Sequence, residues 1–235
     1  KRQPKGARKG VGIAALSPDS GPWQRLESHE ILPLANGESG KIEILADGKT
    51  WLLGRIDAIK ALAKVPEKDV ERAYDSLVDA LEDDFPDVRI AALKTLPSFS
   101  LRRQGILLHC LSDRLQDDED SVREEAMTCL KKVAPLFPSG CEEILRRELR
   151  DTRKDHRGNA FEALKLASKE WPEVGCLHLD ELIREEEGDL RIRGSMILRT
   201  IASKGGAEAW DLIGWSLQDE EVQVRRNASK TLTIL

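Results

Sequence analysis

The most regular chemistry-bearing residues of this 235-residue chain are six arginines, one every 34 residues, here called the arginine column. They are Arg55, Arg89, Arg123, Arg157, Arg191 and Arg225. Six residues before five of them stands an acid (the acid column), and only the first repeat departs, with Lys49. These acids are Asp83, Asp117, Asp151, Glu185 and Asp219. Guanidinium and carboxylate groups form charge-assisted hydrogen bonds, so the columns predict a structural ladder between repeats. A row of ligand-binding arginines is the alternative.

Other residue types that could carry chemistry form no recognisable site. The four cysteines, Cys110, Cys129, Cys141 and Cys176, form no C-x-x-C pair, and their spacing to histidines matches no zinc pattern. The chain has no phosphate-binding glycine loop, no G-x-S-x-G sequence and no dinucleotide-binding fingerprint. We therefore expect no catalytic, metal-binding or cofactor-binding residues, and reduced cysteines in an intracellular protein.

The residues that follow each arginine have the spacing of a buried helical stripe. Three residues after each arginine stands a small residue, here called the small column. Its members are Ala58, Ala92, Ala126, Ala160, Gly194 and Ala228. Seven residues after each arginine stands a leucine, here called the leucine column. Its members are Leu62, Leu96, Leu130, Leu164, Leu198 and Leu232. Offsets of three and seven lie on one helical face. The pattern predicts a helix that begins near each arginine, with Asp87, Ser121, Asp155 and Asp189 as its N-caps.

A further apolar column predicts an earlier helix in each repeat, twelve residues before the arginine. Its members are Leu77, Leu111, Leu145, Leu179 and Ile213. Each repeat is thus predicted as helix, tight turn, helix, with the acid column in the last turn of the first helix. One such hairpin cannot bury its apolar face alone, so neighbours must stack. We expect twelve helices in six hairpins, with the small and leucine columns buried.

The repeated pattern is L-x-D, followed by five residues and then by R-x-x-A-x-x-x-L. This pattern closely resembles the short, bilin-lyase-type HEAT-like repeat. The clearest copies are DDFPDVRIAALKTL, DDEDSVREEAMTCL and DEEVQVRRNASKTL. The first repeat departs at Asp47 and Lys49, and the fourth has His156 where valine is usual. The resemblance implies an all-α fold, a right-handed, armadillo-like α-solenoid of about six hairpins. It also implies use as a scaffold or docking surface, without naming the partner.

The repeats divide the chain into two predicted parts. Residues 1–38 form a basic, Gly/Pro/Ser-rich tail and lead-in, and residues 39–235 form the solenoid. Residues 41–53 could form a β-hairpin instead. The last helix ends in apolar residues without a polar cap, whereas solenoid ends need a polar outer face. We therefore expect the natural chain to continue, or this end to associate with another copy.

Charge points to one candidate partner surface. The chain carries net −5, but the predicted second helices together carry +10 and the first ten residues +5. Five or eight residues after the arginine lies one cation per repeat, here called the cation row. Its members are Lys60, Lys94, Lys131, Lys165, Arg199 and Lys230. The row predicts a docking site for an acidic protein segment, although a solvated helix face gives the same pattern.

These observations together favour a non-catalytic protein–protein interaction scaffold or adaptor. One alternative is an enzyme or enzyme subunit of the bilin-lyase-like HEAT class. Another is a nucleic-acid-binding solenoid, which the negative net charge and the lack of interleaved aromatic residues disfavour. No uncharged run approaches the ~20 apolar residues of a membrane span, so we expect no membrane partner.

Overall fold

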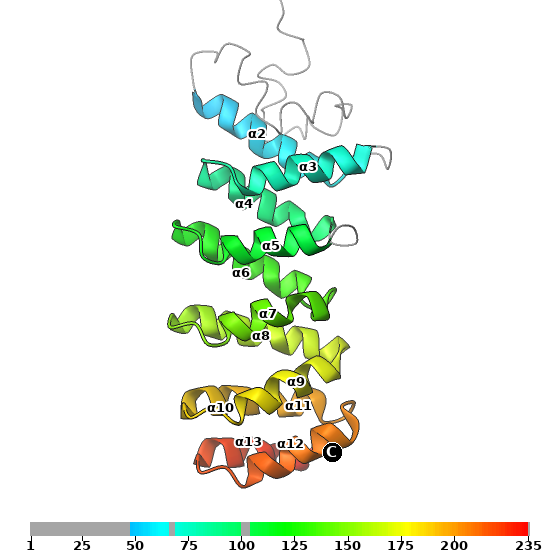
Figure 1. The fold of residues 1–235 in the computed structure, drawn as a ribbon, viewed down its shortest axis with the longest axis vertical. Coiled ribbons are helices and arrows are strands. Elements are labelled where there is room, and N and C mark those ends of the chain that lie inside the picture. Colours follow the sequence, from blue (N-terminus) through cyan, green and yellow to red (C-terminus); the bar gives the residue numbers. More distant parts are fainter. Residues whose placement is uncertain (1–47, 66–68, 100–103, 235) are drawn as a thin grey trace, which may run out of the picture. The chain divides into compact units, whose positions relative to one another are not determined.

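The computed structural model describes residues 48–65, 69–99 and 104–234, and within these ranges the chain is all-α (Figure 1). This confirms the predicted fold class. The predicted tail over 1–38 and the first helix of the first repeat lie outside the described residues. Of the segment for which a β-hairpin was the alternative, residues 48–53 are helical and residues 41–47 lie outside the described ranges. The chain divides into two compact units after Cys129.

The first unit holds the second helix of the first repeat and the hairpins of the next two repeats. Its helices are α2 (Gly48–Leu62), α3 (Val70–Leu81), α4 (Pro86–Thr95), α5 (Gln104–Arg114) and α6 (Asp120–Val133), the last of which runs on past the division. A 3₁₀ turn, Leu96–Ser98, follows α4. Second helix packs on second helix, α2 against α4, and first helix on first helix, α3 against α5. This layering is typical of a helical-repeat solenoid.

The second unit continues the same arrangement through three more hairpins. Its helices are α7 (Pro138–Glu148), α8 (Lys154–Glu170), α9 (Pro172–Leu182), α10 (Gly188–Ser195), α11 (Leu198–Ile201), α12 (Gly206–Leu217) and α13 (Val222–Leu232). The first helices α7, α9 and α12 pack on one another in chain order, and α10 and α11 pack on α13. Proline begins α7 and α9, as it does α4, because the first helical position needs no N–H donor.

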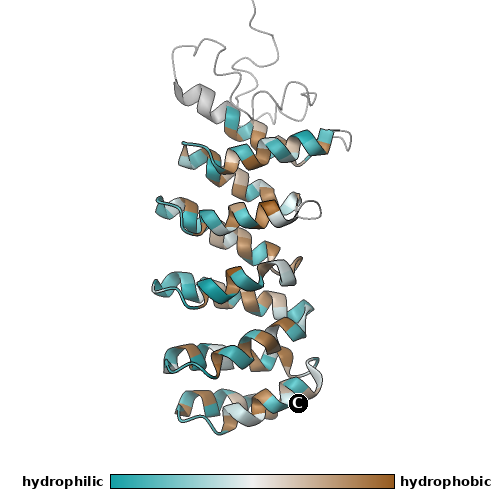
Figure 2. Ribbon diagram, viewed as in Figure 1, coloured by the Kyte–Doolittle hydropathy of each residue, from teal (hydrophilic) through white to brown (hydrophobic). Residues whose placement is uncertain are grey.

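The apolar columns form the core, and each helix carries both hydrophobic and hydrophilic segments (Figure 2). All six members of the small column are buried, as are five of the six leucines. The expectation fails at Leu232, which is 40% exposed. This leucine lies in the last turn of α13, and α13 packs on α10, α11 and α12 from one side only among the described helices. The earlier-helix column, Leu77 to Ile213, is buried throughout.

The predicted second helix of the fifth repeat is broken into α10 and α11. Met196 N–H donates to the Arg193 carbonyl and Ile197 N–H to the Gly194 carbonyl, which are i→i−3 bonds that tighten the turn. The Ser195 hydroxyl also donates to a backbone carbonyl, that of Ile192. Gly–Ser pairs are common causes of such breaks. Glycine also allows a close approach to α9, because a Cβ at Gly194 would lie only 3.0 Å from Leu182 Cβ.

The predicted N-caps are wrong. The helices α4, α8 and α10 begin earlier, so that Asp87, Asp155 and Asp189 lie inside the first turn and make no cap hydrogen bond. Ser121 is likewise inside α6, which begins at Asp120. Acids in a first turn still interact favourably with the helix dipole. The turn before each second helix is held by other groups, described below.

Among the described residues, no helix is both long enough and apolar enough to cross a bilayer.

Candidate functional site

Each arginine from Arg89 to Arg225 reaches back over the turn of its own repeat. Its Nη1 donates to the backbone carbonyl of the acid-column residue six positions earlier. In four of the five repeats the same nitrogen also reaches the next carbonyl, and for Arg191 the two distances are 2.7 and 2.9 Å. These carbonyls follow the end of the first helix and have no helical partner. The arginine therefore closes the turn inside the hairpin.

Three arginines also bond the acid of the next repeat, 28 residues further on. Arg55 Nη2 lies 2.5 Å from Asp83 Oδ2, and Arg89 Nη2 lies 2.7 Å from Asp117 Oδ1. In the second unit, Arg191 Nε lies 3.1 Å from Asp219 Oδ2. All of these side chains are largely buried. At Arg89 and at Arg191, one guanidinium thus joins the turn of its own repeat to the turn of the next.

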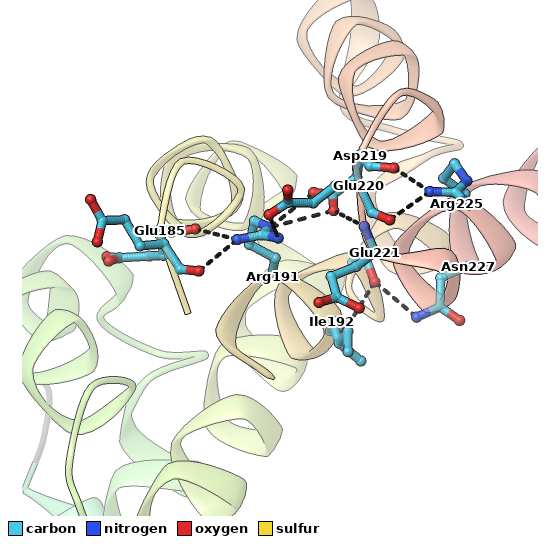
Figure 3. Close-up of polar contacts among 10 residues, drawn as sticks. Glu185, Arg191, Ile192, Asp219, Glu220, Glu221, Arg225 and Asn227 are labelled. Atoms are coloured by element: carbon cyan, nitrogen blue, oxygen red, sulfur yellow. Dashed lines mark hydrogen bonds and ion pairs between the residues drawn. The ribbon is translucent and has the colours of Figure 1, made fainter. Parts of the chain in front are cut away.

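Figure 3 shows this double contact at Arg191, which lies between Glu185 on one side and Asp219 and Glu220 on the other. Arg225 makes only the contact within its own repeat among those drawn, and its Nη1 donates to the backbone carbonyls of Asp219 and Glu220. Arg191 and Arg225 therefore meet opposite sides of the same turn.

The ladder departs from the predicted pairing at Arg157. Its Nη2 lies 3.5 Å from Asp189 Oδ2, and its contact is not with the column acid Glu185. Glu185 instead accepts from Arg150, at 2.6 Å from Nη2. Glutamate is one methylene longer than the aspartate of the other repeats, so its carboxylate extends away from the turn. Asp151 is held within its own turn by Arg153, at 2.6 Å.

The acid column has a second role that the sequence analysis missed. Its aspartates lie after the first helix has ended, not in its last turn, and each accepts the N–H of the residue two positions on. The accepted N–H groups are those of Phe85, Glu119, Arg153 and Glu221. Aspartate side chains form such turns readily. The sequence did contain an indication of these turns, because four of the five column acids are aspartate.

These contacts affect the acidity of the column carboxyls. Burial raises the pKa of Asp117, but hydrogen bonds from Arg89 and from the Glu119 N–H outweigh it and hold the pKa below its ordinary value. For Asp151 the hydrogen bond from Arg153 is the largest cause and lowers the pKa to about 2. Both groups are therefore anions at neutral pH, as ion-pair partners must be.

The cation row is partly occupied by local partners. Two of its lysines lie near acids of their own helix, with Lys60 Nζ 3.1 Å from Asp57 and Lys165 Nζ 3.5 Å from Glu162. Two others reach the next repeat, with Lys94 Nζ 3.5 Å from Glu125 and Lys131 Nζ 3.1 Å from Asn159 Oδ1.

The last two members, Arg199 and Lys230, are exposed, and neither side chain has an ion pair or hydrogen bond with the described part of the chain. They are therefore the members of the row best placed to meet a partner.

One cluster of possible metal ligands lies in the second unit. Ligand-type atoms of Glu148, Asp151 and His156 lie within 4.8 Å of one another. His156 is the residue that replaces valine in the repeat, and its Nδ1 lies 3.6 Å from the buried carboxylate of Glu148. Arg147 already contacts Glu148 at 2.8 Å, and Arg153 contacts Asp151. Two guanidinium groups beside these carboxylates oppose a bound cation, so we interpret the cluster as structural.

The four cysteines are free thiols and all are buried. Burial raises the pKa of Cys141 to about 12, and burial together with nearby Glu208 and Glu173 raises that of Cys176 to about 11. A thiol that resists ionisation is a poor nucleophile and a poor metal ligand. Neither cysteine has the properties of a catalytic residue.

A hollow that was not predicted from the sequence lies between α9 and α12 in the second unit. Trp215 lines it and is 65% exposed. The available signal was the apolar residues that do not belong to any column, Leu177 and Trp215, on the exposed side of two successive first helices.

Comparison with known families supports the repeat assignment in the first part of the chain. Residues 42–131 match the profile described as HEAT repeats. This stretch is therefore similar to HEAT repeats. The arginine, small and leucine columns continue beyond it at the same 34-residue spacing. Comparison with curated protein sequences found no match.

Several solved structures are similar in fold. A computationally designed armadillo repeat protein for modular peptide recognition is 16% identical, with a TM-score of 0.42, and the match covers 87% of this chain and 98% of that one. A TOG domain of crescerin, which regulates microtubules in the primary cilium, is 15% identical, with a TM-score of 0.49 and coverage of 87% and 90%. The archaeal HEAT-like repeats protein from Thermococcus onnurineus NA1 is 15% identical, with a TM-score of 0.48 and coverage of 95% of each chain.

Proposed function

We propose that the chain is a non-catalytic, intracellular scaffold whose second helices dock an acidic segment of a partner protein. The observation that carries the proposal is the exposure of Arg199 and Lys230, together with the lack of a partner for either side chain among the described residues. Both are exposed cations on the second helices of successive repeats, without a local acid among the described residues. The arginine column, in contrast, is engaged within the fold and is not available to a ligand.

The chemistry of the row fits a protein segment better than a small ligand. Exposed ion pairs contribute only ~0–1 kcal/mol each, so useful affinity must come from several contacts along an extended partner. The local pairs of Lys165 with Glu162 and of Lys94 with Glu125 are exposed on the lysine side and 3.5 Å long. Such weak pairs can exchange for partner carboxylates at little cost.

Several observations support a binding role over a catalytic one. HEAT repeats are a fold commonly used for protein binding, and the buried arginines of the described repeats serve the ladder. The cysteines are buried and form no disulfide with one another, which fits a reducing compartment. The bilin-lyase-like alternative predicts a bound chromophore, and visible absorbance of protein purified from its natural source would favour it.

A direct test uses a fluorescein-labelled oligoglutamate peptide as the acidic probe and fluorescence anisotropy as the readout. We expect saturable binding at low salt that weakens steeply as salt rises, because exposed charges are screened beyond ~8 Å at physiological ionic strength. Reversal of both free cations, Arg199→Glu with Lys230→Glu, should weaken binding about tenfold or more.

The matched control reverses two exposed lysines of the same unit that lie outside the row, Lys154→Glu with Lys169→Glu. It removes the same charge and should leave affinity within about twofold. Equal losses in the two variants would show that the probe senses only net charge, and would contradict docking on the row.

A further inference from the structure

A groove of about 370 Å³ lies between α9 and α12, two successive first helices of the second unit. From α9 it is lined by Glu173, Leu177 and Asp180, and from α12 by Glu208, Asp211 and Trp215. An adjoining hollow on the other side of Trp215 is lined in part by Arg184. Trp215 is thus the wall that the two hollows share. This surface belongs to the first helices, whereas the cation row lies on the second helices.

The groove presents apolar surface to solvent. Trp215 is 65% and Leu177 is 42% exposed, while Leu212 forms part of the lining and is buried. Neighbouring exposed apolar side chains mark an interaction site more often than a single exposed apolar side chain does. Tryptophan is also enriched among the residues that dominate binding energy at interfaces.

The rim of the groove is acidic and incompletely neutralised. Glu173, Glu208 and Asp211 are exposed, and none has an ion pair or hydrogen bond within the described chain. Asp180 contacts Arg184 at 2.7 Å, and both of these side chains are exposed. The helices α9 and α12 contain no lysine or arginine. The negative field extends to the floor, where Glu208 and Glu173 add to burial in raising the pKa of Cys176.

We propose that this groove binds a basic segment of a partner protein, which places one apolar side chain against Trp215 and Leu177 and directs lysine or arginine side chains to Glu173, Glu208 and Asp211. The proposal is independent of the acidic segment proposed for the cation row, because the two surfaces use different helices and opposite charge. Carboxylates paired with guanidinium groups give the short, strong contacts that fix such a segment.

Charge argues against the other possible occupants. Nucleic acid binds through cations that neutralise its phosphates, and α9 and α12 supply none. A second copy that offered the same face would bring acid against acid. An acidic segment would meet the same repulsion. A basic segment is the occupant that turns the rim charges into favourable contacts.

The test uses the full chain and a fluorescein-labelled basic peptide, with a central leucine flanked on both sides by arginines. Two comparison peptides carry serine in place of the leucine, or glutamates in place of the arginines. We expect the basic peptide to bind, the serine peptide to bind about tenfold more weakly and the acidic peptide not to bind to the groove. Binding should also shield Trp215, so tryptophan emission should shift to shorter wavelength in the parent and not in Trp215→Phe.

Two variants locate the site on the protein. Neutralising the rim by Glu173→Gln, Glu208→Gln and Asp211→Asn should weaken binding about tenfold or more, and Trp215→Ala should do the same. The control removes three exposed acids elsewhere, by Asp118→Asn, Glu124→Gln and Glu170→Gln, and should keep the parent affinity. Circular dichroism melting serves to establish that each variant is folded.

Several outcomes would overturn the proposal. They are an equal loss in the rim and control variants, equal binding of the leucine and serine peptides, or no saturable binding up to about 1 mM. Self-association of the chain that Trp215→Ala abolishes would also overturn it, because the occupant would then be a second copy.

Discussion

Arg89 Nη2 lies 2.7 Å from Oδ1 of Asp117, which belongs to the next repeat, and both side chains are buried. Nη1 of the same guanidinium donates to the Asp83 carbonyl in its own repeat, also at 2.7 Å. Asp117 in turn accepts the Glu119 N–H and so shapes the turn that Arg123 closes. An arginine and an acid at fixed spacing therefore form one connected network from turn to turn. This explains why both residue types recur in step.

The double role of the column aspartates can be separated by substitution at Asp219. Asp219→Asn keeps an oxygen that can accept the Glu221 N–H but loses the charge facing Arg191, whereas Asp219→Ala loses both. We expect the alanine variant to lower the free energy of unfolding by ~3 kcal/mol. The asparagine variant should lose ~1 kcal/mol less than the alanine variant, because it keeps a hydrogen bond of ordinary strength. Urea denaturation measures both.

The exposed, unpaired Asp211 provides the control, since Asp211→Ala should change stability by no more than about 0.5 kcal/mol. Equal losses for asparagine and alanine at position 219 would contradict a separate contribution of the turn.

His178 should make the protein less stable in mild acid. Its ring is buried in α9, and neither ring nitrogen has a hydrogen-bond partner among the described residues. Burial lowers the pKa of His178 to about 4. Glu181 and Glu143 oppose this shift, and Arg146 and Arg150 add to it. With an ordinary pKa of ~6.5, the unfolded chain binds a proton before the folded one does. Stability should therefore fall by ~2–3 kcal/mol as pH drops from 7 to 4.

Urea midpoints across this pH range measure the effect, and His178→Leu should flatten the slope. Asp117, Asp151 and Glu181 have lowered pKa values, so the stability they contribute is lost only as pH falls below ~4. An unchanged slope in the leucine variant would show that His178 does not titrate as the structure implies.

All four thiols should be protected in the folded protein. They are buried, and the pKa values of Cys110, Cys141 and Cys176 are raised by burial, which keeps the reactive thiolate scarce. We expect Ellman's reagent to react slowly at neutral pH and to label all four rapidly in denaturant. Rapid labelling of any one of them under native conditions would contradict its burial.

The sequence was sufficient to predict the helices and their buried faces. A strict 34-residue period repeats the positions of Leu77 and Ala92, which lie on the first and second helix of one hairpin, in the later hairpins as well. The sequence could not predict helix starts to the residue. The aspartates near Arg89 and Arg191 fit either an N-cap or a first turn, and side-chain spacing alone does not distinguish these. The break after Ser195 depends on local i→i−3 bonds that leave the columns of the repeat intact.

The candidate sites were predicted less completely. The pairing of Arg157 changes because Glu185 is longer than aspartate and Arg150 reaches it first. The groove beside Trp215 is formed by two helices of successive repeats. Leu177 and Trp215 stand out in the sequence as apolar residues outside the columns, but their positions alone do not show that the two helices enclose a groove. The cation row was visible as a pattern, but only the structure shows that Lys131 and Lys165 have local partners.

The arginine column couples successive repeats, and its side chains are engaged within the fold. A double-mutant cycle on Arg89→Ala and Asp117→Ala, with free energies of unfolding from urea denaturation, tests this coupling most directly. We expect each single variant to lose ~3 kcal/mol or more and the double variant to lose ~1–3 kcal/mol less than the sum. Additive losses, or single variants with the parent's midpoint, would show that the two residues do not interact, and would return the arginine column to consideration as a ligand site.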